Sequence, residues 1–126
     1  MIRSKFGEFI AERRKEKGIG LRKMADIMGI SAAYWSDIEK GRRNPPAMDK
    51  IEEIAKILEL TQEEIDYVID LAADDRGEIP MDLPEYIMES DLARTALRQA
   101  HKNKSEGRSD ITDKAWKDFI KAIAKK

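Results

Sequence analysis

The chain has 126 residues, of which 39% are charged and 6% aromatic, and it contains no cysteine. This length suits one domain or a small domain with an extension, and the lack of cysteine excludes disulfides and thiolate zinc clusters. The single histidine, His101, lies in a lysine-rich polar segment where no nucleophile, base and acid can be assembled. We therefore expect a protein that is not an enzyme, with no cofactor and no metal site.

The net charge of −1 is the sum of three blocks of different sign. Residues 1–60 carry a net charge of +3, residues 61–93 carry −10 and residues 94–126 carry +6. If the chain binds a nucleic acid, the middle block should face away from it, because phosphate would repel these carboxylates. The middle block is also expected to attract the basic C-terminal block, within one chain or across a dimer. No apolar run approaches the ~18 residues of a membrane span. The N-terminus lacks a signal-peptide core, so a soluble cytoplasmic protein is expected.

The first predicted elements are two short helices. Residues 4–17 form an amphipathic helix to which Phe6, Phe9 and Ile10 contribute the apolar side. Residues 21–28 form the second helix, because apolar side chains recur there at i, i+3, i+4 and i+7. These side chains are Leu21, Met24, Ala25 and Met28.

A tight turn and a third helix follow. Gly29 is expected to end the second helix, since glycine adopts the left-handed conformation without steric cost, and Ser31 is a natural N-cap for the third helix. That helix carries Trp35 and Ile38 inward and ends at Gly41. The arrangement predicts a helix-turn-helix, whose second helix enters the major groove of DNA. An ordinary helical hairpin is the alternative.

Two flanking segments resemble those of Xre/Cro-type, lambda-repressor-like DNA-binding domains. They are residues 13–18, RRKEKG, and residues 36–46, SDIEKGRRNPP. The resemblance covers about residues 4–60 and implies an all-α fold that begins with a five-helix DNA-binding domain. It also implies that Arg14 pairs, largely buried, with Glu39 late in the recognition helix.

The same resemblance assigns roles around a recognition helix of about residues 31–40. Leu21 stands where many relatives carry a glutamine that touches DNA, so one polar contact is missing. Asp37 can accept a hydrogen bond from cytosine, but it can also cap locally or pair with a nearby cation. The side chains expected to face bases are Ala32, Ala33, Ser36 and Asp37. Those expected to meet the DNA backbone are Arg22, Lys23, Ser31, Tyr34, Lys40, Arg42, Arg43 and Asn44.

The next segment is predicted to complete the DNA-binding domain. A fourth helix follows the prolines at 45 and 46, and its apolar face consists of Ile51, Ile54, Ala55 and Leu58. Thr61 and Glu64 form a capping box that opens a fifth helix, which runs to about Ala73. Residues 74–80 are the clearest linker in the chain.

The C-terminal part is predicted to be a helical extension of about three helices. A short helix starts at Leu83, a second follows Ser90 as its N-cap, and a third is capped by Thr112. The predicted domains are residues 1–76, which bind DNA, and residues 77–126, which mediate dimerisation or bind a partner.

Two functions fit this organisation. The first is a sequence-specific transcriptional regulator, expected to be a repressor that binds a palindromic operator as a homodimer, because one recognition helix reads too few base pairs. The second is an antitoxin-type regulator that binds its own promoter and neutralises a protein partner through the C-terminal helices. A toxin or an antirepressor would be such a partner. The apolar side chains beyond residue 82 favour a dimer interface, and their burial against the fifth helix of a monomer is the alternative.

Overall fold

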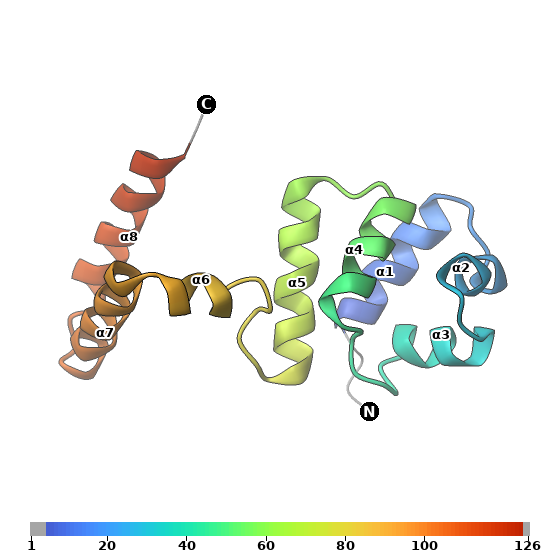
Figure 1. Ribbon diagram of the computed structural model, residues 1–126, viewed down its shortest axis with the longest axis horizontal. Coiled ribbons are helices and arrows are strands. Elements are labelled where there is room, and N and C mark those ends of the chain that lie inside the picture. Colours follow the sequence, from blue (N-terminus) through green and yellow to red (C-terminus); the bar gives the residue numbers. More distant parts are fainter. Residues whose placement is uncertain (1–4, 125–126) are drawn as a thin grey trace. The chain divides into compact units, whose positions relative to one another are not determined.

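The computed structural model describes residues 5–124, so residues 1–4 and 125–126 lie outside it, including the predicted first residue of the first helix. Between residues 5 and 124 the chain has eight helices and no strand, which confirms the predicted all-α fold class (Figure 1). The helices are α1 (Lys5–Glu16), α2 (Leu21–Met28), α3 (Ala32–Glu39), α4 (Met48–Ile57), α5 (Gln62–Arg76), α6 (Pro84–Glu89), α7 (Asp91–Ser105) and α8 (Ser109–Ile123).

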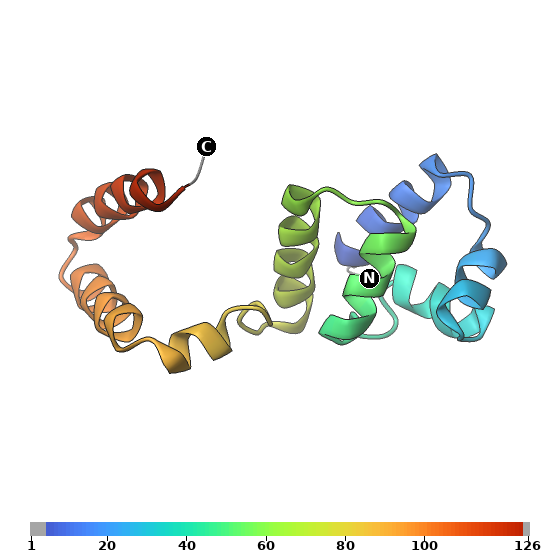
Figure 2. The same cartoon turned by 45° about the horizontal axis from the view of Figure 1, so that its top comes forward.

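Helices α1 to α5 surround one hydrophobic core. α1 packs against α5 on one side and against α3 on the other, while α2 packs on α3 and α4 packs on α5 (Figure 2). Each helix contributes the apolar stripe expected from its sequence, which removes these side chains from water. The largest fully buried side chains are Trp35, Phe6, Ile10, Met24, Ile51, Ile54, Leu58 and Val68.

The turn between α2 and α3 has the geometry that its sequence predicts. Gly29 ends α2 in the left-handed conformation, with φ of 71°, and the amide of Ile30 donates to the carbonyl of Ala25 at 3.0 Å. The Ser31 hydroxyl accepts a hydrogen bond from the Tyr34 amide at 3.0 Å, which caps α3. α3 itself ends at Glu39, two residues before the predicted end at Gly41.

α1 approaches the C-terminal end of α3 unusually closely at Gly7. A Cβ atom at this position would collide with the backbone carbonyl of Glu39. Because backbone atoms cannot move aside as a flexible side chain can, only glycine permits this helix crossing. The close approach brings the last turn of α3 against α1.

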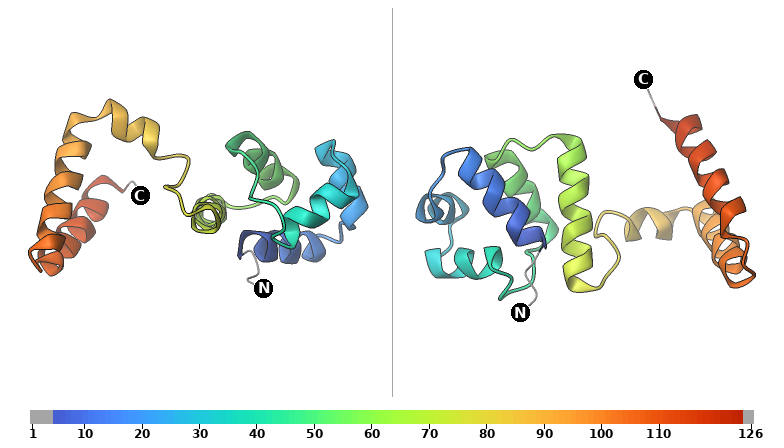
Figure 3. Two further views of the ribbon diagram at one scale, coloured as in Figure 1. Left: turned by 90° about the horizontal axis from the view of Figure 1, so that it is seen from below. Right: turned by 180° about the vertical axis from the view of Figure 1, so that it is seen from behind.

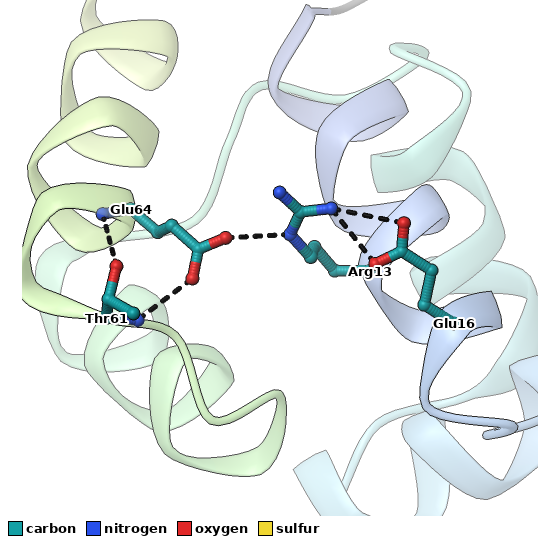
Figure 4. Close-up of polar contacts among 4 residues, drawn as sticks. All are labelled: Arg13, Glu16, Thr61 and Glu64. Atoms are coloured by element: carbon teal, nitrogen blue, oxygen red, sulfur yellow. Dashed lines mark hydrogen bonds and ion pairs between the residues drawn. The ribbon is translucent and has the colours of Figure 1, made fainter.

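α5 is attached to α1 by a set of polar and aromatic contacts. Arg13 Nε donates to Glu64 Oε2 at 2.9 Å, and Glu64 is also the reciprocal member of the predicted capping box with Thr61 (Figure 4). The rings of Phe9 and Tyr67 meet edge to face, with centroids 5.3 Å apart. The Thr61 amide and the Arg13 guanidinium hold the pKa of the Glu64 carboxyl below its usual value.

Replacing Glu64 by glutamine is expected to lower the melting temperature at about pH 7, and the difference from wild type should shrink as the pH falls below 4.5. A carboxylate with a lowered pKa in the folded state stabilises the fold above its ordinary value of 4.5, and this contribution is lost as the pH falls through the lowered pKa. Thermal melts followed by circular dichroism measure the effect, with Glu63→Gln on the exposed side as control. A difference that persists at low pH would show that the carboxylate charge is not what Arg13 and Thr61 recognise.

The first compact unit continues beyond the end of α5. Arg76 Nη2 donates hydrogen bonds to the carbonyl oxygens of Pro45 and Pro46, the latter at 2.8 Å, and Met81 packs against the core. The compact units join at Pro84 and Glu85, whereas the sequence places the domain division at residue 76. α5 extends to Arg76 rather than Ala73, so the predicted linker begins three residues too early.

The second unit is a helical hairpin preceded by the short helix α6. α7 and α8 pack on each other (Figure 3), and the Ser90 hydroxyl caps α7 by accepting from the Ala93 amide, as predicted. α8 begins at Ser109, so the prediction that Thr112 caps it is wrong. The Thr112 hydroxyl instead accepts a hydrogen bond from Asn103 Nδ2 at 2.8 Å, which ties α8 to α7.

Candidate nucleic-acid interface

α3 has a buried face and an exposed face. Trp35, Ile38 and Glu39 are buried, whereas Ala33 and Tyr34 are exposed and Ser36 and Asp37 are partly exposed. Helical periodicity accounts for this division, because positions 35, 38 and 39 lie on one side of the helix. Ala32 is partly buried and packs against the core, so only part of its surface is free to face bases.

The buried face is held by a polar cluster of Arg14, Trp35 and Glu39. Arg14 Nε and Nη2 donate to the two carboxylate oxygens of Glu39 at 2.7 and 2.9 Å, and Trp35 Nε1 donates to Glu39 Oε2 at 2.6 Å. Arg14 Nη1 also reaches the carbonyl of Ile19 at 2.9 Å, which secures the connector before α2. The hydrogen bonds to Glu39 raise the pKa of Arg14 despite its burial.

This cluster fixes the rotation and position of α3 on α1. Glu39 accepts from both α1 and its own helix, so its carboxylate is satisfied although it is buried. The family resemblance predicted the Arg14–Glu39 pair, but it did not predict the hydrogen bond from Trp35 to Glu39. The four-residue spacing of Trp35 and Glu39 on one helix was the signal for it.

Basic side chains gather next to the exposed face of α3. Arg43 lies over the Tyr34 ring with its Cζ atom 4.5 Å from the centroid. Arg42 Nη1 lies 3.5 Å from one oxygen of Asp37, and Arg43 Nε lies 3.8 Å from the other. Asp37 is therefore engaged by local cations, which is the alternative that its position in the sequence left open.

The other residues expected to meet the DNA backbone are solvent-accessible. Arg22 and Lys23 are exposed in the first turn of α2, and Lys40 and Asn44 are exposed after α3. Leu21 is partly buried against the core, so its apolar side chain contributes to packing and offers no polar group to DNA. The hydroxyl of Ser31 accepts from the Tyr34 amide, so its proton stays available for donation to an anion.

Comparison with known proteins defines the family. The family model described as a helix-turn-helix domain matches residues 5–68, half of the chain. An uncharacterised HTH-type transcriptional regulator of Mycobacterium tuberculosis is 37% identical over 57 residues, which are 45% of this chain and 40% of that protein. The HTH-type transcriptional regulator SinR of Bacillus subtilis is 31% identical over 55 residues, 44% of this chain and 50% of SinR. The HTH-type transcriptional regulator DdrOP3 of Deinococcus deserti is 29% identical over 89 residues, 70% of this chain and 68% of that protein.

The chain belongs to the helix-turn-helix domain family, as an Xre-like member. The match covers half or less of the length of the first two relatives. No solved structure gives a significant match. In the stretch from residue 5 to residue 124, no helix combines the length and the apolar character that crossing a membrane requires.

Proposed function

We propose that the protein is a sequence-specific DNA-binding transcriptional regulator that represses transcription from a palindromic operator. The observation that carries this proposal is the construction of α3. Its buried face is fixed by the cluster of Arg14, Trp35 and Glu39, and its opposite face presents short side chains beside exposed cations. A rigidly held helix with a narrow outer surface fits the major groove, which admits one α-helix.

The exposed residues then divide into two roles. Ala33 and Ser36, with the free part of Ala32, contact base edges: an alanine methyl packs on the methyl of thymine, and a serine hydroxyl bonds several edges. The cations and polar groups flanking α3 contact phosphate and set the register of the helix on the duplex. These groups are Arg22, Lys23, Ser31, Tyr34, Lys40, Arg42, Arg43 and Asn44.

Selection of binding sites from random duplex DNA tests the proposal. The full chain is expected to enrich a two-fold symmetric sequence with short half-sites. Where such a site overlaps a promoter, a bound protein represses transcription by excluding polymerase, without a further contact. Failure to enrich any sequence would contradict sequence-specific binding, and increased transcription from a reporter carrying the selected site would contradict repression.

Arg42→Ala and Arg43→Ala are each expected to weaken binding to all DNA sequences, because each removes a phosphate contact. Each should also reduce the magnitude of the slope of log K against the logarithm of salt concentration by about 1 per recognition helix. Ser36→Ala is the contrasting variant, and it is expected to change the preferred sequence while leaving the salt dependence unaltered. Fluorescence anisotropy titrations at several salt concentrations measure both quantities. A changed consensus with an unaltered salt slope in Arg42→Ala would contradict the phosphate role.

Homodimerisation is the second part of the proposal. Within the described residues, no side chain of α6, α7 or α8 is buried, and Leu92 is 84% exposed. Apolar surface on this scale is typical of an interface. Two recognition helices about 34 Å apart are also what a two-fold operator requires, and the acidic and basic blocks attract each other across a two-fold axis. The exposed apolar side chains are Tyr86, Met88, Leu92, Leu97, Ile111, Phe119, Ile120 and Ile123.

Leu92→Glu is expected to convert a full-length dimer into a monomer and to weaken operator binding by at least tenfold, because it places a charge in the apolar interface. Thr95→Glu, an exposed position in the same helix, is the matched control and is expected to remain dimeric. Sedimentation equilibrium at tens of micromolar measures both variants. A monomeric wild-type chain, free and on DNA, would contradict the dimer and would favour the antitoxin-type alternative with a protein partner for these helices.

A further inference from the structure

The carboxylate of Asp37 lies between two arginines on the surface proposed to meet DNA. Oδ1 is 3.5 Å from Arg42 Nη1 and Oδ2 is 3.8 Å from Arg43 Nε. Both distances exceed the usual length of a hydrogen bond, so the guanidinium groups keep N–H donors for other partners. The side chains of Arg42 and Arg43 are more than half exposed, and that of Asp37 is about one-third exposed, at 32%.

The backbone and the neighbouring ring keep this trio together. The amide of Arg42 donates to the carbonyl of Asp37 at 2.9 Å, which folds the loop back on the last turn of α3. Arg43 lies over the Tyr34 ring of the same helix. Both arginines are therefore organised by α3 itself, and Asp37 reduces the charge of the trio from +2 to +1.

Asp37 is the one acidic side chain between residues 27 and 48 that is not buried. Between residues 27 and 48 the sequence contains two acidic residues, Asp37 and Glu39, and Glu39 is buried against Arg14. A phosphate that approaches Arg42 or Arg43 therefore also approaches the Asp37 carboxylate. The repulsion weakens any complex that depends on phosphate contacts alone, which is how proteins bind non-cognate DNA.

We propose that Asp37 determines specificity by weakening the binding of non-cognate DNA, and this inference rests on the DNA-binding function proposed above. In a non-cognate complex phosphate repels the Asp37 carboxylate, and no hydrogen bond from a base offsets this repulsion. In the cognate major groove it lies near base edges, where the amino groups of cytosine and adenine donate hydrogen bonds. The cognate complex thus offsets the repulsion, whereas the non-cognate complex does not.

Asp37→Asn tests the inference, because asparagine keeps the shape of the side chain and removes its charge. The probes are the duplex selected by the wild-type protein and a scrambled duplex of equal length and composition. For each recognition helix on the scrambled duplex, affinity at about 0.15 M salt should rise roughly fivefold, and the salt dependence of log K should steepen by about 1, as for one additional phosphate contact. Affinity for the selected duplex should change less than about twofold, so the ratio of the two affinities should fall several-fold.

Three further variants separate this effect from other effects of charge. Asp70→Asn makes the same charge change on the exposed side of α5 and should leave the ratio unaltered. In a protein that carries Arg42→Ala and Arg43→Ala, the further change Asp37→Asn should no longer steepen the salt dependence. Asp37→Ala should reproduce the result of Asp37→Asn, since the charge and not the amide is responsible.

Several results would overturn the inference. If Asp37→Asn weakened binding to both duplexes equally, Asp37 would only hold the arginines in place. If Asp37→Asn left both affinities unaltered, the charge of Asp37 would be irrelevant to specificity. An equal fall in the ratio for Asp70→Asn would assign the effect to net charge. In each of these cases the wild-type protein still selects a sequence, so the proposed function stands. If the wild-type protein selects none, the proposed function and this inference fail together.

Discussion

Replacing Trp35 by alanine is expected to lower the free energy of unfolding of the first unit by about 3–5 kcal/mol. The side chain is completely buried among the helices of the core, so its removal leaves a large cavity. The variant also loses the hydrogen bond from Trp35 Nε1 to Glu39 at 2.6 Å. The remaining carboxylate is then buried with one donor fewer, which adds to the cost.

Chemical denaturation followed by circular dichroism measures this loss. The chain has a second tryptophan, Trp116 in α8, so tryptophan fluorescence would report on the second unit as well as the first. Trp35→Phe is the matched control, because it retains most of the apolar volume and removes only the N–H donor. We expect it to cost less than the alanine change. A denaturation midpoint unchanged in Trp35→Ala would contradict the central place of this side chain in the core.

Arg14→Ala and Glu39→Ala are each expected to cost about 3–5 kcal/mol, because either change leaves an uncompensated charge in the interior. The pair is bidentate, with N···O distances of 2.7 and 2.9 Å, and both side chains are more than nine-tenths buried, with 8% and 7% exposed. Each member also has a second partner, the Ile19 carbonyl for Arg14 and the Trp35 indole for Glu39. The loss should therefore also loosen α3 and reduce DNA binding.

A double-mutant cycle separates the interaction from the individual residues. The double change to alanine should cost less than the sum of the single changes, since no unpaired charge remains. The surface pair Lys50–Glu53, 3.5 Å apart and with side chains at least 40% exposed, is the matched control. Breaking it should cost less than about 1 kcal/mol. Strictly additive losses for Arg14 and Glu39 would contradict the direct interaction.

Local signals in the sequence were sufficient for most of the helices. α2 and the turn after it follow from apolar spacing, the left-handed glycine at 29 and the Ser31 cap, all of which act within a few residues. The capping box at Thr61 and Glu64 is local in the same way. The same reasoning failed at α8, where Thr112 has the right residue type for a cap but bonds to Asn103 of the preceding helix. A residue type that favours helix caps indicates only that its side chain can form the capping hydrogen bond. The tertiary contacts of that side chain determine whether the bond forms.

The contacts that position the candidate interface are long-range in the sequence. Gly7 against the end of α3, Arg13 on Glu64 and Arg76 on the carbonyls at 45 and 46 join residues at least 30 positions apart. Apolar periodicity says which face of each helix is buried, but not which helix covers it, because the hydrophobic effect is non-directional. The packing of α1 on α3 and α5 thus decided where Arg14, Trp35 and Glu39 converge. The folded loop after α3 places Asp37 between two arginines, because these contacts require both the last turn of α3 and the loop to be in place.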